Sequence, residues 1–181
     1  MLTEPSTVAS GCQALARACR TDREAHSKFA GVLELLVAAL HTFGGTDPVV
    51  MRSGCAALAS LCRNSADGQA KAAAQGAFTA LAACARAHPQ HLGVACAAIE
   101  SLCTGKGAAA RRVQAVDAGW LPLLIDACGH LPTAQCGTSA NDDTTERTRL
   151  AARSALRSIT RDSLHLHQAA LDAGSSRQWL M

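Results

Sequence analysis

A nine-residue pattern occurs four times in this chain, and it constrains the fold more than any other feature. Its clearest copy is Gly54–Cys62 (GCAALASLC), and the others are Gly11–Cys19, Ala95–Cys103 and the more divergent Ala152–Thr160. Successive copies start 43, 41 and 57 residues apart (11 to 54, 54 to 95 and 95 to 152). A period near 40 residues, carried by helix-forming residues, is typical of proteins built from stacked helical repeats.

A second motif, a glycine that follows a short helix, lies between the copies of the first. Its glycines are Gly31, Gly76, Gly119 and Gly174. An apolar run follows the first three of them, at 32–37, 77–81 and 120–125. Glycine is favoured just after a helix because it adopts positive φ without a Cβ clash. Each unit is therefore predicted to contain a short helix, a glycine turn, a middle helix and a long third helix that carries the nine-residue pattern.

This unit resembles the armadillo repeat, a three-helix unit with Ala-Gly before an apolar middle helix and Ala-Leu-x-x-Leu in the third. Asp117–Leu124 (DAGWLPLL) is the best match, and the two-helix HEAT repeat is the second candidate. The resemblance covers about three and a half units. It implies an all-α fold, a right-handed α-solenoid superhelix in one domain. The expected divisions are a partial repeat 1–20, repeats 21–63, 64–104 and 105–161, and a partial repeat 162–181. The uncovered repeat ends are expected to be capped by another segment, to continue in a longer chain or to meet a second copy.

Composition supports this interpretation. Aromatic residues make up only 3% of the chain, and alanine, leucine and cysteine supply the apolar residues, which suits closely packed helices better than a sheet. Six of the nine cysteines form pairs seven residues apart, about 10 Å along a helix, too far for a disulfide or a shared zinc ion. We therefore expect buried free thiols in a reducing intracellular compartment, the cytoplasm or the nucleus. No segment has the composition of a membrane span or a signal peptide.

Local signals place the elements. Long helix Thr7–Arg20, short helix Arg23–Ala30 and middle helix Val32–Thr42 are expected first. Asp47 is predicted to cap the next long helix, with Pro48 in its first turn. The apolar stripe of that helix is Met51, Cys55, Leu58 and Cys62.

The fourth copy comes late because the chain carries about 14 extra residues before it. The surplus lies in 132–147, whose composition is polar and includes Asn141, Asp142 and Asp143. We predict a surface loop there, with Asp143 or Thr144 capping the following helix.

No catalytic motif occurs in the sequence, so we expect neither an enzyme nor a cofactor. His165 and His167 are two residues apart on an expected helix, where their rings point to different faces, so no metal site is predicted. Asp142 and Asp143 are interpreted as solvated charge in the loop.

The armadillo resemblance implies that the third helices line a groove that binds an extended peptide. Peptide-binding members often carry a tryptophan on the third helix and an asparagine four residues later. The tryptophan positions here are Gln13, Ala56, Ala97 and Ser154, and the asparagine positions are Arg17, Ser60, Ser101 and Ser158. None of these positions carries the tryptophan or the asparagine of the family, which disfavours import-type signal recognition. A serine hydroxyl still forms hydrogen bonds with a peptide backbone, although its reach is shorter. Our candidate partner contacts are therefore residues at the asparagine positions: Arg17, Ser60 and Ser101.

A row of arginines gives a second candidate surface. Arg149, Arg153, Arg157 and Arg161 recur every four residues, on one slowly turning helix face. No acidic residue stands between them, and guanidinium groups bind carboxylates and phosphates in a bidentate way. Nucleic acid is less favoured as a partner because the net charge is only +3 and no aromatic residues alternate with the arginines.

The sequence therefore predicts a non-enzymatic protein-interaction or scaffold module whose partner is a protein or an extended peptide. Two alternatives remain open. One is an adaptor that binds signal peptides in the groove. The other is a binder of acidic peptide or nucleic acid through the arginine row.

Overall fold

The computed structural model describes residues 4–21, 30–129 and 139–180. Every regular element within these ranges is a helix, which confirms the expected all-α fold. The elements are α1 (Pro5–Thr21), η1 (Ala30–Val32), α3 (Leu33–Phe43), α4 (Pro48–Cys62), α5 (Ala66–Ala74), α6 (Ala77–Ala87), η2 (Pro89–His91), α7 (Leu92–Leu102), α8 (Ala108–Asp117), α9 (Trp120–Gly129), α10 (Ser139–Thr160), α11 (Leu164–Asp172) and α12 (Arg177–Leu180). Across these ranges, no helix is at once long enough and apolar enough to traverse a bilayer.

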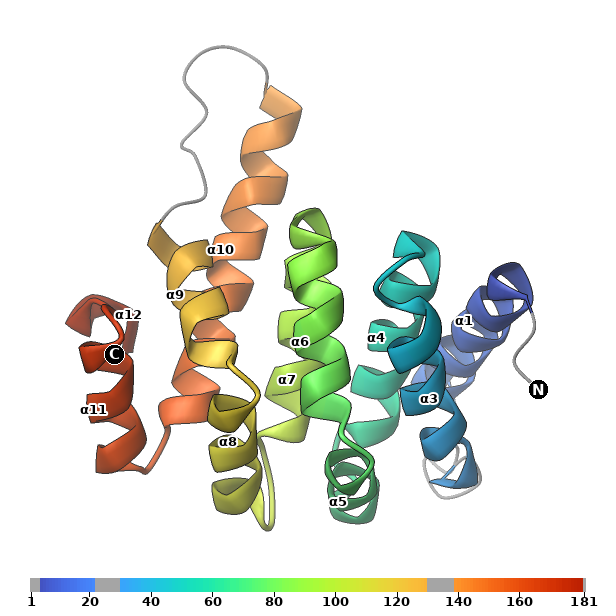
Figure 1. Ribbon diagram of the computed structural model, residues 1–181, viewed down its shortest axis with the longest axis horizontal. Helices are drawn as coiled ribbons and strands as arrows, with labels where there is room; N and C mark the ends of the chain where they lie inside the picture. The colour runs from blue at the N-terminus through green and yellow to red at the C-terminus, as the bar shows by residue number, and fades with distance from the viewer. Residues whose placement is uncertain (1–3, 22–29, 130–138, 181) are drawn as a thin grey trace.

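The helices stand side by side in a row that follows the sequence (Figure 1). Helices α3, α6 and α9 form the near layer, and α4, α7 and α10 lie behind them. In the rear layer α1 packs on α4, α4 on α7 and α7 on α10. In the near layer α3 packs on α6, and α6 on α9. Each unit therefore contacts the unit before it and the unit after it, and α11 and α12 pack on α10 at the end of the row.

The four copies of the nine-residue pattern lie in the rear layer, in α1, α4, α7 and α10. The predicted stripe of α4 is confirmed, because Met51, Cys55, Leu58 and Cys62 are fully buried. The first cysteine of the first three copies, Cys12, Cys55 or Cys96, is buried in the core, and Cys55 of α4 lies near Cys12 of α1 and Cys96 of α7. Small residues at these positions allow the helices to pack closely.

All eight cysteines in the described ranges are buried and form no disulfide, as the spacing predicted for the three pairs. Burial raises the pKa of the Cys62, Cys96 and Cys103 thiols to about 12. These thiols are therefore neutral at physiological pH and act as small apolar side chains.

The start of α4 follows the predicted capping arrangement. Asp47 has an extended backbone, and its carboxylate accepts hydrogen bonds from the Val49 and Val50 amides at 2.7 and 3.0 Å. Pro48 occupies the first turn, where its missing N–H removes no helical bond. The predicted bounds of the first long helix and of the middle helix 32–42 also agree with α1 and α3 to within two residues.

Three of the four predicted glycine turns are confirmed. Gly76, Gly119 and Gly174 have φ of 79°, 82° and 99°, the left-handed conformation that glycine adopts readily. The prediction for Gly31 is wrong, because this residue lies within η1 and has no positive φ. The chain enters α3 through a right-handed 3₁₀ turn, so no left-handed residue is needed there. The predicted helix 23–30 falls outside the described residues except for Ala30, which belongs to η1.

The predicted surface loop at 132–147 is wrong over its second half. Helix α10 begins at Ser139, so both proposed capping residues, Asp143 and Thr144, lie inside the helix. The polar composition was a poor guide because acidic residues are favoured in the first turns of a helix. Residues 132–138 lie outside the described residues.

Candidate functional site

The face shared by α1, α4 and α7 carries an open hollow of about 450 Å³, which we call the N-terminal hollow. Two predicted contact residues, Arg17 of α1 and Ser60 of α4, both line it. The remaining lining residues are Gln13, Ala16, Val49, Arg52, Ser53, Ala56 and Val94. The structure therefore brings together residues of three successive third helices that lie far apart in the sequence.

A second hollow of about 290 Å³, the middle hollow, contains the third predicted contact residue, Ser101. Its other lining residues are Arg63, Asn64, Ala97, Glu100 and Thr104. Ser60 and Ser101 occupy the same position in their copies of the nine-residue pattern. The two hollows thus repeat along the third helices, and they are the candidate binding surface.

The serines in these hollows are already engaged as hydrogen-bond donors. Ser60 Oγ donates to the Ala56 carbonyl at 2.8 Å, and Ser101 Oγ donates to the Ala97 carbonyl at 2.9 Å. A hydroxyl has one hydrogen to donate but two lone pairs to accept with. Each serine can therefore accept a hydrogen bond from a bound segment, but it does not replace the two-sided amide contact of an asparagine.

The fourth copy differs at the equivalent positions. Ser154 Oγ donates to Glu100 Oε1 of α7 at 3.1 Å, and this bond joins α10 to α7. Ser158 is only 5% exposed, so it is not available to a partner. The regular groove positions therefore end between α7 and α10.

The arginine row does not form one solvent-exposed face. Arg149 pairs at 2.8 Å with Glu146, which lies three residues before it on α10. Arg153 is half-buried and lies against Cys128 of α9, while Arg157 and Arg161 are exposed. Arg149 and Arg153 therefore do not share an exposed face with Arg157 and Arg161, and binding of a partner by the row stays a prediction.

Cys128 of α9 lies beneath the first arginines of the row. Burial raises the pKa of the Cys128 thiol, and the nearby guanidinium groups of Arg153 and Arg149 oppose that rise. The thiol is 4% exposed, so it packs beneath the arginines as part of the core. Arg153 occupies the position that a cysteine holds in the other three copies.

A set of buried polar side chains that the sequence did not predict bridges neighbouring units. In α5, the Gln69 amide nitrogen donates to the carbonyls of Cys62 and Ser101, both at 3.0 Å. Gln69 is 2% exposed, and it joins the C-terminal ends of α4 and α7. These carbonyls belong to the last helical turns, which have no partners within their own helix.

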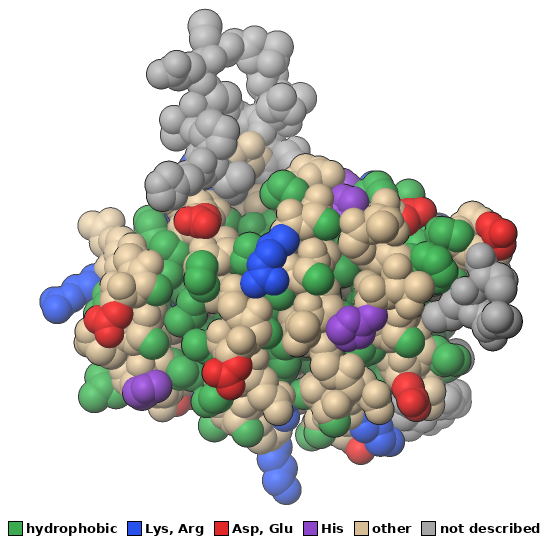
Figure 2. All heavy atoms as spheres, viewed as in Figure 1, with side chains coloured by type: hydrophobic (Ala, Val, Ile, Leu, Met, Phe, Trp, Pro, Cys, Tyr) green, Lys and Arg blue, Asp and Glu red, His purple; other side chains and the backbone are tan. Residues whose placement is uncertain are grey.

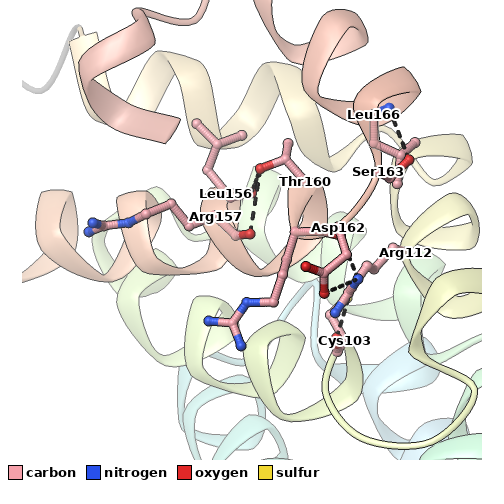
Figure 3. Close-up of polar contacts among 9 residues, drawn as sticks. Cys103, Arg112, Leu156, Arg157, Thr160, Asp162, Ser163 and Leu166 are labelled. Atoms are coloured by element: carbon pink, nitrogen blue, oxygen red, sulfur yellow. Dashed lines mark hydrogen bonds and ion pairs between the residues drawn. The ribbon is translucent and has the colours of Figure 1, made fainter. Parts of the chain in front are cut away.

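Arg112 plays the same part in α8. Its Nε donates to the Cys103 carbonyl at 3.1 Å and its Nη1 to the Arg161 carbonyl at 2.5 Å, which joins the ends of α7 and α10 (Figure 3). The same Nη1 lies 3.8 Å from the exposed carboxylate of Asp162. Gln69 and Arg112 each stand seven residues before a turn glycine (76 and 119), and this shared spacing is the signal that could have identified them.

Among these bridging side chains, Arg111 of α8 donates the most hydrogen bonds. Its guanidinium donates to the carbonyls of Leu102, Thr104 and Lys106 at 2.6, 2.6 and 3.0 Å, and to Gln69 Oε1 at 2.8 Å. Burial lowers the pKa of Arg111, but an arginine keeps its charge at neutral pH. The side chain therefore joins α8 to Gln69 of α5, to the end of α7 and to the segment that follows α7.

The described residues offer no assembled metal centre, since no group of three or more His, Cys, Asp or Glu side chains is placed to hold an ion. His165 and His167 both lie on α11, the first exposed and the second half-buried.

The face formed by α3, α6 and α9 shows charged groups only as scattered single side chains (Figure 2). The site with repeated geometry is therefore the pair of hollows on the third helices. Comparisons with protein-family models, with curated proteins and with solved structures found no match for this chain.

Proposed function

We propose that this chain is an armadillo-like solenoid module that binds an extended segment of a partner protein along α1, α4 and α7. It is a non-enzymatic interaction or scaffold protein. The observation that carries the proposal is the repetition of the hollows, in which Ser60 and Ser101 hold equivalent positions on successive helices. A surface that repeats at the spacing of neighbouring helices suits a ligand whose own backbone repeats, such as an extended peptide.

The charges near the hollows disfavour a carrier of basic signal peptides. The N-terminal hollow contains Arg17 and Arg52, and no acidic residue is among its described lining residues. Among the described residues that line the middle hollow, Glu100 is the single acid, and it already accepts a hydrogen bond from the Ser154 hydroxyl. A basic peptide would therefore meet like charge at one end of the groove.

The free thiols support a location within a reducing compartment, the cytoplasm or the nucleus, because an oxidising compartment favours disulfides. This part of the proposal is tested by fractionating cells that produce the full chain.

Selection from a displayed library of random peptides tests the binding function. Enriched peptides are resynthesised with a photoreactive residue and cross-linked, and mass spectrometry locates the attached positions. We expect attachment to α1, α4 and α7. Attachment confined to α3, α6 and α9, or the absence of any enriched peptide, would overturn the proposal.

Matched variants test the same point by affinity. Ala56→Gln with Ala97→Gln places longer side chains in both hollows, whereas Ala38→Gln with Ala83→Gln makes the same change on exposed positions of α3 and α6. Glutamine is a good helix former, so neither pair disrupts its helices. We expect weaker peptide binding, by about tenfold, only for the first pair.

A further inference from the structure

The N-terminal hollow combines two cations with an apolar floor. The guanidinium groups of Arg17 on α1 and Arg52 on α4 both line it, and both side chains are exposed. Val49 on its edge remains 45% exposed. Guanidinium groups bind carboxylates through paired, charge-assisted hydrogen bonds, and the apolar surface next to them can hold the aliphatic part of the same ligand.

The hydrogen-bonding groups of this hollow also suit a carboxylate beside a peptide backbone. Gln13 offers amide donors close to the arginines, and Ser60 offers lone pairs to a backbone N–H. Because none of the described lining residues is acidic, the local field attracts anions.

The charge pattern continues along the groove. The middle hollow holds Arg63 together with Glu100, whose carboxylate is bonded to Ser154 of α10. One unit further along, Arg157 occupies the position in α10 that Glu100 occupies in α7, and its side chain is exposed. The third helices therefore present Arg17 and Arg52 in the N-terminal hollow and Arg157 on α10, just beyond the regular groove positions, with the engaged acid Glu100 between them.

We infer that the segment bound by these third helices is acidic, with a carboxylate seated between Arg17 and Arg52 in the N-terminal hollow. The inference rests on the proposed function, since it names the partner chemistry of the same groove. Neighbouring helices lie about 8–10 Å apart, and an extended chain rises about 3.3 Å per residue, so one unit spans about three peptide residues. Acidic residues are thus expected at intervals of about three, separated by small or aliphatic ones.

Fluorescence anisotropy with three labelled peptides of equal length tests the inference. One peptide carries glutamate at every third position, the second glutamine and the third lysine, with alanine and serine between. We expect the glutamate peptide to bind about tenfold more tightly than the glutamine peptide, with the lysine peptide weakest, and its affinity to fall as salt is added.

Two double variants then locate the effect. Arg17→Gln with Arg52→Gln removes both cations of the hollow, and Lys71→Gln with Arg177→Gln removes the same net charge from α5 and α12. All four side chains are exposed, so both variants should fold, which circular dichroism checks. We expect the first variant to lose the preference for glutamate over glutamine and the second to keep it.

The outcomes separate the two levels of the proposal. Equal binding of the glutamate and glutamine peptides, or a preference that survives the removal of Arg17 and Arg52, overturns the acidic assignment while leaving groove binding in place. Failure of library peptides to cross-link to the third helices overturns the proposed function itself. A single-stranded oligonucleotide that binds more tightly than the glutamate peptide, and loses affinity in the Arg17 and Arg52 variant, also overturns the peptide assignment.

Discussion

The unit α5–α7 and the unit α8–α10 follow the same plan, but their polar bridges differ. In the first unit a neutral side chain, Gln69, bonds the carbonyls at the ends of α4 and α7. In the second unit Arg112 bonds the ends of α7 and α10, and Arg111 adds four further bonds. Both arrangements supply hydrogen-bond donors to carbonyls at helix ends, which have no partner within their own helix. Both junctions place buried donors against helix ends, with an amide in one unit and guanidinium groups in the other.

The largest expected effect comes from breaking the second junction. Arg111→Met keeps much of the side-chain volume but leaves the carbonyls of Leu102, Thr104 and Lys106 and the oxygen of Gln69 without their donor. We expect the free energy of unfolding to fall by about 3–5 kcal/mol, measured by urea denaturation. Gln69→Met should cost about 2 kcal/mol by the same measurement. If both variants lost less than about 1 kcal/mol, the bridges would not stabilise the junctions.

Alkaline pH tests the core of the first unit. Burial raises the pKa of Cys96 in α7 and of Cys103, which directly follows α7, to about 12, against an ordinary value of 9.0. Above pH 9 the unfolded chain loses thiol protons that the folded chain keeps, so stability present below that pH is lost as pH rises towards 12. Each such thiol should lower the free energy of unfolding by roughly 1 kcal/mol per pH unit in this window.

Urea denaturation in a reducing buffer at about pH 8 and about pH 10 measures this loss. Cys96→Ala should show a shallower dependence than the unchanged chain, because alanine has no proton to lose. An unchanged urea midpoint between the two pH values would show that these thiols are not buried as neutral groups.

The turn glycines sharpen the comparison between units. Gly119→Val in the second unit forces a left-handed residue to carry a branched side chain, and its Cβ would lie 2.7 Å from Arg86 Nη2. Gly76→Val meets the same backbone strain, but its nearest atom, His41 Nε2, is 3.5 Å away. We expect both to lower the free energy of unfolding by about 1–3 kcal/mol, with Gly119→Val at the upper end.

Gly31→Ala is the matched control for these turns. Gly31 has no positive φ, and a Cβ there meets no atom within 4 Å. The substitution should therefore leave thermal stability unchanged or slightly higher. Melting temperatures that stay constant in all three variants would contradict the assignment of the left-handed turns.

The smallest effect concerns the first residue of the nine-residue pattern. A Cβ on Gly54 in α4 would lie 2.7 Å from Leu40 Cδ2, whereas a Cβ on Gly11 in α1 meets nothing within 4 Å. Gly11→Ala should stabilise the chain by about 0.5–1 kcal/mol through helix propensity. Gly54→Ala should instead destabilise it by about 1 kcal/mol, because Leu40 must move. Calorimetry that gives the same sign for both would show that α3 and α4 are not in close contact at Gly54.

Many of the helices and turns could be predicted from local sequence patterns. The capping of α4 by Asp47, the buried stripe from Met51 to Cys62 and the turns at Gly76 and Gly119 depend on neighbours within a few residues. The start of α10 was misjudged because polar residues are common both in loops and in first helical turns. Gly31 was misassigned because the same Ala-Gly pair occurs in a 3₁₀ turn as well as after a helix.

The candidate site was only partly predictable. Arg17, Ser60 and Ser101 were placed by aligning the repeats, and the structure puts them in the two hollows. Arg52 and Val49 were not foreseen, because nothing in their local sequence marks which side of α4 faces the hollow. Arg149 and Arg153 carried a regular spacing, but their contacts with Glu146 and Cys128 removed them from a shared exposed face.

The sequence by itself determined the repeat period of about 40 residues, the helical character of the segments and the apolar face that each third helix buries. These follow from interactions between residues close in the chain and from the spacing of small apolar side chains. Only the tertiary structure decided that Gln69, Arg111 and Arg112 bridge the ends of helices up to 49 residues away, and that Arg17 and Arg52 share one hollow. The physical reason is that a donor's partner and a charge's neighbours depend on which helices pack together.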